Sequence, residues 1–185
     1  QLNVHVRYYI LPNAPVGALV REVTIHNQSA DTWDLELADG LAALLPAGVG
    51  NAVYKEIGNT LKSWFDVEAH EMFNFYHLRG STEDTEDVKE IENGNFYASL
   101  VNGETGTLIY DRDLIFGQDQ TLRTPQNFFK HAVSEIKTQN QISTNKVSGG
   151  FTLWDGTLAA GEKLSLTTMI GYGKNREITR VFLNE

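Results

Sequence analysis

The sequence predicts a mainly β protein, an antiparallel β-sandwich with one embedded amphipathic helix. Segments in which apolar and polar residues alternate recur through most of the chain, as expected for strands with one buried face. Turns rich in glycine, asparagine or proline separate these segments. Only one stretch has apolar residues at helical spacing. Many short strands with a single helix favour a sandwich over repeated β–α–β units.

The first part of the chain contains three predicted strands. Residues 2–10 alternate as far as Arg7, and a proline-containing turn at residues 11–15 ends this strand. Residues 18–27 resume the pattern, and a polar turn leads to a third strand at residues 33–37. We expect these three strands to be neighbours in one antiparallel sheet.

The single helix is predicted to begin at Asn51, a suitable N-cap residue, and to end near Phe65. Its apolar residues fall at i, i+4, i+8 and i+11 on one face, namely Val53, Ile57, Leu61 and Trp64. Gly58 weakens an isolated helix by up to about 1 kcal/mol relative to alanine, so we expect this apolar stripe to pack against a sheet. The glycines just before the helix, in residues 46–51, have the general arrangement of an anion cradle. They lack the P-loop and dinucleotide signatures, and we interpret them as a tight strand-to-helix connection.

The second half contains further strands rich in aromatic and β-branched residues, at 71–78, 95–101, 107–111, 150–154 and 163–171. The loop at residues 102–106 resembles a hairpin turn between the second and third of these strands. Residues 128–136 fit either a strand or a short helix.

Composition limits the architecture and the partners. With 185 residues and 41% hydrophobic content, the chain can bury one substantial core, so we predict a single domain spanning residues 1–185. Fifteen Lys and Arg residues against 24 Asp and Glu residues give a formal charge of −9, which repels nucleic acid and anionic membranes. We expect neither as a partner.

The absence of cysteine excludes disulfides and thiolate metal sites and is compatible with a reducing cytoplasm. The sequence contains neither a signal-peptide pattern nor an apolar run long enough to cross a bilayer. It begins without methionine and already in a strand-like pattern, from which we expect a fragment of a longer protein.

Four blocks of sequence together resemble one family. They are VREVTIHN at residues 20–27, LELADGLAALLPAGVGNAVYKEIGNTLKSWFDVE at 35–68, FNFYHLRGSTEDTEDVKEIENGNFYASL at 73–100 and NQISTNKVSGGFTLWDGTLAAGEKLSLTTMIG at 140–171. This sequence is similar to the amino-terminal β-sandwich region of cellobiose-phosphorylase-like glycoside phosphorylases, most closely the 1,2-β-oligoglucan phosphorylase branch. The resemblance implies a galactose-mutarotase-like super-sandwich.

The resemblance also implies where the chemistry takes place. In that family, inorganic phosphate cleaves the glucan in a separate (α/α)6 barrel, and none of the four blocks is a catalytic signature. The implied partners are therefore this barrel, β-glucan oligosaccharide and, as in related phosphorylases, a second subunit of a homodimer. No catalytic residue, metal or cofactor is carried over.

Several residues carry groups with possible chemical roles. The acidic run at residues 81–92 offers Glu83, Asp84, Glu86 and Asp87, which we interpret as a solvated loop because runs of like charge are usually exposed. Asp111 and Asp113 flank Arg112 and are expected to be self-neutralised at a strand end. The histidines are too scattered to predict a metal site; they are His5, His26, His70, His77 and His131.

Sugar recognition pairs an exposed aromatic face with planar hydrogen-bonding groups. The candidate aromatic residues are Trp33, Trp64, Trp154, Phe73, Phe75 and Tyr76. Most of them are expected in the core. Within this set Tyr76, together with Arg79, leads into the acidic run, and we predict that these two residues contact a ligand or a neighbouring domain at the surface.

Three functions remain open from the sequence. The first is a non-catalytic domain of a glycoside phosphorylase, the second a free-standing carbohydrate-binding module, and the third a small enzyme that uses the acidic run. Binding or turnover measured on the isolated chain distinguishes them.

Overall fold

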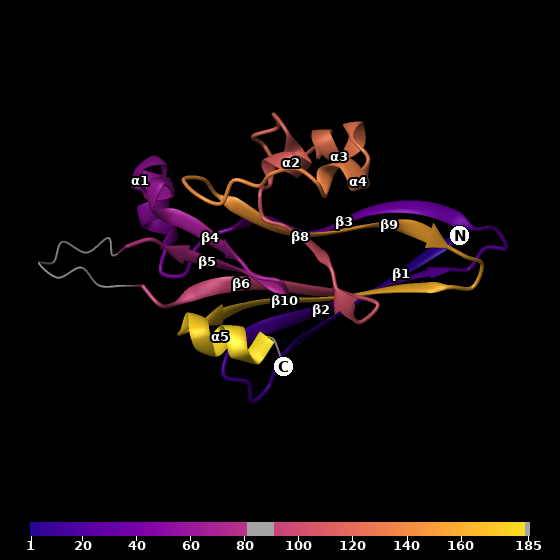
Figure 1. Ribbon diagram of the computed structural model, residues 1–185, viewed down its shortest axis with the longest axis horizontal. Helices are drawn as coiled ribbons and strands as arrows, with labels where there is room; N and C mark the ends of the chain where they lie inside the picture. Colours follow the sequence, from indigo (N-terminus) through magenta and orange to yellow (C-terminus); the bar gives the residue numbers. More distant parts are fainter. Residues whose placement is uncertain (81–90, 184–185) are drawn as a thin grey trace, which may run out of the picture.

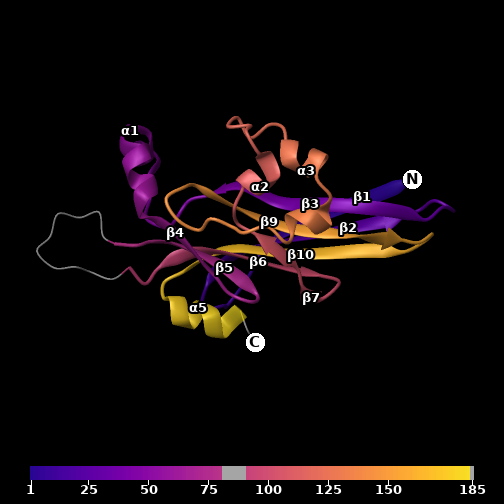
Figure 2. The same cartoon turned by 45° about the horizontal axis from the view of Figure 1, so that its top comes forward.

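The computed structural model describes residues 1–80 and 91–183, which form two antiparallel β-sheets packed face to face (Figure 1). Helices cover the outer face of each sheet, and one further helix projects from an end of the sandwich (Figures 1 and 2). The predicted mainly β, antiparallel sandwich is confirmed. The single predicted helix is only one of several helical segments.

The larger sheet has the strand order β1-β2-β10-β6-β5-β4, with the short β7 paired to β6. Its strands are β1 (Leu2–Ile10), β2 (Gly17–Asn27), β10 (Lys163–Gly173), β6 (Gly94–Val101), β5 (Phe73–Leu78), β4 (Phe65–Ala69) and β7 (Glu104–Thr105). The late strand β10 lies between β2 and β6, so both ends of the sequence contribute to the centre of this sheet. The short β4, beside β5, was not predicted.

The smaller sheet consists of β3 (Trp33–Leu44), β9 (Ser148–Leu158) and β8 (Thr107–Ile109), in the order β3-β9-β8. Two pairing predictions were wrong here. We expected β3 beside β1 and β2, and we expected a hairpin from β6 into β8, but both β3 and β8 pair with β9 instead. Alternation of apolar and polar residues determines which face of a strand is buried; it does not determine the neighbouring strand.

The core between the sheets is apolar with a few buried polar links. Its apolar residues include Val23, Ile25, Leu44, Val67, Leu158, Leu164 and Leu166. Two buried tyrosines of the larger sheet reach across to β9: the Tyr97 hydroxyl lies 2.9 Å from Thr152 Oγ1, and the Tyr76 hydroxyl donates to the Gly149 carbonyl at 2.7 Å. Both hydroxyls therefore have partners inside the core, as buried polar groups require.

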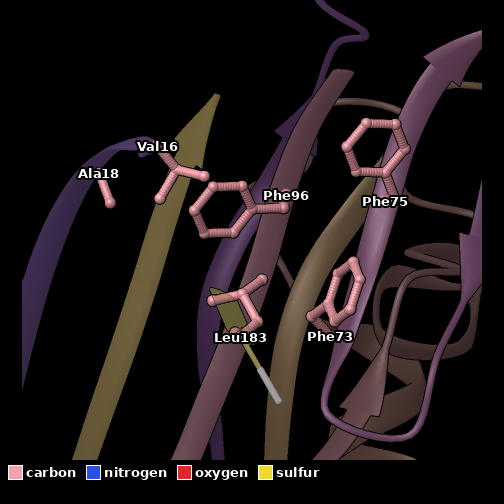
Figure 3. Packing of buried hydrophobic residues seen from close by; sticks show 7 residues of the cluster. Val16, Ala18, Phe73, Phe75, Phe96 and Leu183 are labelled. Atoms are coloured by element: carbon pink, nitrogen blue, oxygen red, sulfur yellow. The ribbon is translucent and has the colours of Figure 1, made fainter. Parts of the chain in front are cut away.

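Helix α5 (Arg176–Leu183) covers the outer face of the larger sheet. Figure 3 shows Leu183 close to Phe73 and Phe96 in a cluster that also contains Val16, Ala18 and Phe75. The predicted burial of the two β5 phenylalanines is confirmed.

The outer face of the smaller sheet is covered by three short helices, α2 (Asp113–Phe116), α3 (Gln126–Lys130) and α4 (Val133–Ile136) (Figure 1). Their buried residues Ile115, Phe116, Val133 and Ile136 pack on Phe151 and Leu153 of β9. Residues 128–136, which fitted a strand or a helix in sequence, thus belong to two helices. None of α2, α3 and α4 exceeds five residues, so each depends on this packing rather than on its own helical propensity.

Helix α1 (Asn51–Leu61) continues into the 3-10 turn η1 (Lys62–Trp64) and points away from both sheets (Figure 1). Gly50, not Asn51, occupies the N-cap position. The predicted docking of an apolar stripe was wrong: Leu61 is buried, but Ile57 and Trp64 are exposed, and the side chain of Val53 lies outside the described part. Non-helical backbone angles at Ile57 (φ −126°, ψ 25°) interrupt the helix, and Trp64 lies in the following 3-10 turn, so the residues do not share one face.

Candidate functional site

Arg79 lies at the surface directly after β5, where it joins three segments of the chain. Its backbone N–H donates to the carbonyl of Trp64 at 2.8 Å. Its guanidinium donates to the carbonyl of Ser63 in η1 and, at 2.6 Å, to the side-chain oxygen of Asn145. These bonds hold the planar guanidinium against a planar amide at a fixed position. The predicted exposure of Arg79 is confirmed, whereas its contact with a ligand stays a prediction.

Trp64 is the aromatic neighbour of this pair and is 41% exposed. Together with Ser63 and Arg79 it lines a surface cavity of about 340 Å³. A Cβ atom added at Gly80 would lie 3.1 Å from the indole Cζ3, so the absence of a side chain there lets the chain pass close to the ring edge. The expectation that Trp64 belongs to the core was wrong: it lies in the 3-10 turn η1 after α1 and is exposed there, whereas Leu61, three residues earlier, is buried.

Asn145 adopts a left-handed backbone conformation, with a φ of 63°, which asparagine tolerates better than most residues. Its N–H donates to the carbonyl of Phe65 at 3.1 Å, and the N–H of Val67 donates to Ser143 at the same distance. The segment that carries the amide is therefore bonded along β4. The amide cannot move freely relative to Trp64.

A buried ion pair anchors the same segment from its other side. Lys146 donates to the carboxylates of Asp111 and, at 2.6 Å, Asp113. Asp111 is buried, and it also accepts the N–H of Ile142 at 3.0 Å and that of Asp113 at 3.1 Å. The expected self-neutralisation by Arg112 was wrong, since the counter-charge comes from Lys146. Asp111 is thus a structural anion that holds the loop carrying Asn145.

Tyr76, the other predicted contact residue, does not lie at the surface. It is 1% exposed, and its ring belongs to the inter-sheet core. Burial raises the pKa of its hydroxyl well above the ordinary value, because the ionised form would lose its hydration. Residues of β5 alternate between its two faces, and the position of Tyr76 on that strand turns it toward the smaller sheet. The sequence pattern could not reveal that both faces of β5 are covered.

The other candidates do not converge on this corner. Trp33 is 42% exposed, contrary to expectation, and its indole N–H donates to the Ser29 hydroxyl at 2.9 Å. His70 stacks on Phe73 with ring centroids 4.4 Å apart, and burial lowers its pKa. Within residues 1–80 and 91–183, no three His, Asp or Glu side chains are grouped to hold a metal ion. Four residues of the acidic run, Glu83, Asp84, Glu86 and Asp87, lie outside the described residues.

The site that emerges is a corner made by Trp64, Arg79 and Asn145, which we call the tryptophan corner. The sequence predicted the surface position of Arg79, but it placed Trp64 in the core and gave no indication of Asn145. No local signal could have revealed Asn145, because 66 residues separate it from its partner Arg79. Among the helices of the described part, none is long and apolar enough to span a bilayer.

Comparison with known proteins adds no relative. A scan against protein-family models finds no match, and a search of curated proteins finds none either. The likeness to glycoside phosphorylases therefore stays a prediction.

Proposed function

We propose that this chain is a non-catalytic, super-sandwich-type domain of a cytoplasmic glycoside phosphorylase, and that its tryptophan corner contacts β-glucan. The parent reaction is phosphorolysis of a β-glucan to sugar 1-phosphate in the partner (α/α)6 barrel. The observation that carries the proposal is the exposed indole of Trp64 beside the fixed guanidinium–amide pair.

The chemistry of this corner suits a sugar. A pyranose ring presents an apolar C–H face that packs on an indole, while its hydroxyls both donate and accept hydrogen bonds in the plane of the ring. Arg79 supplies donors, and the amide of Asn145 supplies both donors and an acceptor. Because bonds to Ser63, Trp64 and Phe65 hold these groups in place, little conformational entropy remains to be lost on binding.

A non-catalytic role is supported by the state of the described carboxylates. A general acid for glycosidic cleavage needs a carboxyl kept protonated in an apolar pocket and a second carboxylate across the sugar. The carboxylate pair that anchors the loop carrying Asn145, Asp111 and Asp113, shares the cation of Lys146 instead.

The test is an NMR titration of the isolated chain with β-1,2-, β-1,3- and β-1,4-linked gluco-oligosaccharides. We expect shifts of the Trp64 indole N–H and the Asn145 amide, with a weak Kd of about 1 mM, equivalent to about 4 kcal/mol. Trp64→Ala should abolish the shift of the Asn145 amide. It should cost about 1–2 kcal/mol of stability, less than the roughly 3–5 kcal/mol of a fully buried aromatic residue, because the indole is 41% exposed.

The matched control is Trp33→Ala. Trp33 has the same exposure as Trp64 but begins β3, where it pairs with Leu158 at the end of β9, far from α1 (Figure 1). This variant should leave the titration unchanged. If no oligosaccharide perturbs the corner at millimolar concentration, the contact is refuted. Reproducible release of sugar 1-phosphate by the isolated chain would refute the non-catalytic role.

A free-standing carbohydrate-binding module is the alternative that the same exposed indole allows. It predicts a Kd of micromolar order for the isolated chain, since the module would have to bind sugar without help from a catalytic domain. The measured Kd therefore separates the two functions.

A further inference from the structure

The two sheets of the sandwich do not cover each other completely. The path of the larger sheet has six strands and the smaller sheet has three. Strand β3, at the margin of the smaller sheet, lies over β2, because Arg21 on β2 forms an ion pair with Asp39 on β3 at 2.5 Å. Strand β1 lies one position further out. Within residues 1–80 and 91–183, no strand of the smaller sheet lies over it.

The inward face of β1 is consequently an exposed apolar row. Val4 and Val6 pair with Ile25 and Val23, which face the inter-sheet core, so their side chains point to the same side of the sheet. The row continues with Tyr8 and Ile10 at alternating positions. The four residues Val4, Val6, Tyr8 and Ile10 are between 40% and 77% exposed. A contiguous apolar row of this kind on a sheet face marks a contact surface.

The neighbouring strand β3 has an unpaired edge beside this row. Strand β3 is 12 residues long and pairs with β9 along one side. No strand in the described part of the chain pairs with its other side. Alternate residues of an edge strand direct their N–H and C=O groups outward, where they can accept a further strand.

One added strand would pair with the open edge of β3 and also cover the apolar row of β1. Adjacent strands lie about 4.8 Å apart and stacked sheets about 10 Å apart. A strand bonded to the open edge of β3 would therefore lie over β1 and cover its apolar row. A cavity of about 280 Å³ between Tyr8, Leu19 and Leu41 marks one end of the gap.

The charges of β3 indicate the chemistry of the missing strand. Its outward face carries two exposed residues, Asp34, which accepts from Thr157 Oγ1 at 3.0 Å, and Glu36, which accepts the N–H of Val133 at 2.9 Å; the chain as a whole has a net charge of −9. Opposite charges directly across a strand pair stabilise it by about 0.2–1 kcal/mol, and like charges destabilise it. A basic outer face is therefore favoured. A second copy of this acidic chain is disfavoured as the occupant.

We propose that the open edge of β3 and the apolar row of β1 form a strand-acceptor site for an extended segment of another polypeptide. In that segment apolar residues alternate with lysine or arginine. The apolar side chains cover Val4, Val6 and Tyr8, and the basic ones lie beside Asp34 and Glu36. The proposal does not depend on carbohydrate binding.

The probe is a synthetic nonapeptide in which valine alternates with lysine or threonine, compared with a peptide of the same composition in scrambled order. Hydrogen exchange measured by NMR on the intact chain reports the result. We expect the alternating peptide to protect alternate amides of β3 at least tenfold more than the scrambled one. Unchanged exchange along β3 at saturating peptide would overturn the proposal.

A pair of variants on β1 tests the apolar row. Val6→Lys places a charge in the row and should weaken peptide binding at least tenfold. His5→Lys is the matched control, because it adds the same side chain one residue away, at an exposed position on the opposite face. It should change the affinity less than twofold. Thermal melts confirm that both variants fold, and equal affinities of the two folded variants would contradict the proposal.

Charge reversal on β3 tests whether the added segment has a basic outer face. Light scattering tests whether the occupant is a second copy of the chain. Asp34→Lys should weaken binding of the lysine peptide and strengthen that of the corresponding glutamate peptide. Equal binding of both peptides to this variant would contradict the proposed chemistry. A stable dimer of the chain alone that protects the β3 edge would assign the site to a second copy and overturn the proposed occupant.

Discussion

Replacing Tyr76 by phenylalanine tests whether this residue is buried, as in the structure, or contacts a ligand at the surface, as the sequence suggested. The variant removes one hydroxyl and keeps the ring, so the packing of the inter-sheet core is retained. In the structure this hydroxyl is buried and donates to the Gly149 carbonyl at 2.7 Å, at the point where β9 begins beside the larger sheet. The substitution deletes this link between the two sheets.

The expected loss in the free energy of unfolding follows from the Gly149 carbonyl, which is left without its hydrogen-bond donor. Removing one partner of a buried hydrogen bond costs about 1–3 kcal/mol, because the remaining group has lost its hydration without gaining a partner. Tyr76 is 1% exposed, so water cannot easily replace the hydroxyl. A loss of about 2 kcal/mol corresponds to about 4–8 °C in Tm for a domain of this size.

Thermal and urea unfolding of wild type and Tyr76→Phe measure the effect. Tyr172→Phe is the control, because the Tyr172 hydroxyl accepts from Asn93 at 3.1 Å in an exposed position. This control should change stability by less than about 0.5 kcal/mol. A Tyr76→Phe protein that melts with the wild type but binds β-glucan more weakly would refute the reasoning and restore the surface contact.

Three other predictions concern the anchor of the tryptophan corner, a histidine and a glycine. Lys146→Met should cost about 3–5 kcal/mol, because the buried Asp111 loses its cation; Asp111→Asn in the same background should recover part of the loss in urea unfolding. Burial lowers the pKa of His70 below its ordinary 6.5, so the stability that its neutral form contributes is complete above pH 6.5 and declines as the pH falls toward the lowered value. Melts should therefore fall more steeply between pH 7 and about pH 5 for wild type than for His70→Gln, and parallel curves would contradict this. Gly40→Ala should cost about 3 kcal/mol, since its Cβ would lie 2.0 Å from the Gly150 carbonyl at a φ of 155°, whereas Gly17→Ala, which meets no atom within 4 Å, should melt as wild type.

Much of the secondary structure was accessible from local pattern. The alternation of apolar and polar residues located β1, β2 and β10 nearly to their observed ends, and the aromatic and β-branched residues located β6. The burial of one face that the alternation predicted for β1 was wrong, because both faces of that strand are exposed. The acidic composition and the lack of cysteine likewise needed no coordinates. Arg79 was recognised as a surface residue because it follows a strand and precedes a charged segment.

Other features were decided only by contacts between distant residues. The assignment of β3 and β8 to the smaller sheet depends on β9, which follows them in the chain and offers the partner edge for both. The helices α2 and α4 are too short to show a periodic pattern and are stabilised by packing on that sheet.

The tryptophan corner shows the same division between local pattern and tertiary contact. The sequence by itself predicted an amphipathic helix beginning at Asn51 and a strand ending at Leu78, with Arg79 directly after it. Only the tertiary structure decided that Trp64 would be exposed in the 3-10 turn η1 and that Asn145, 66 residues away in sequence, would bond to Arg79. The physical reason is that periodicity records which side of an element is apolar, whereas the neighbour that covers that side is chosen by the packing of the whole chain.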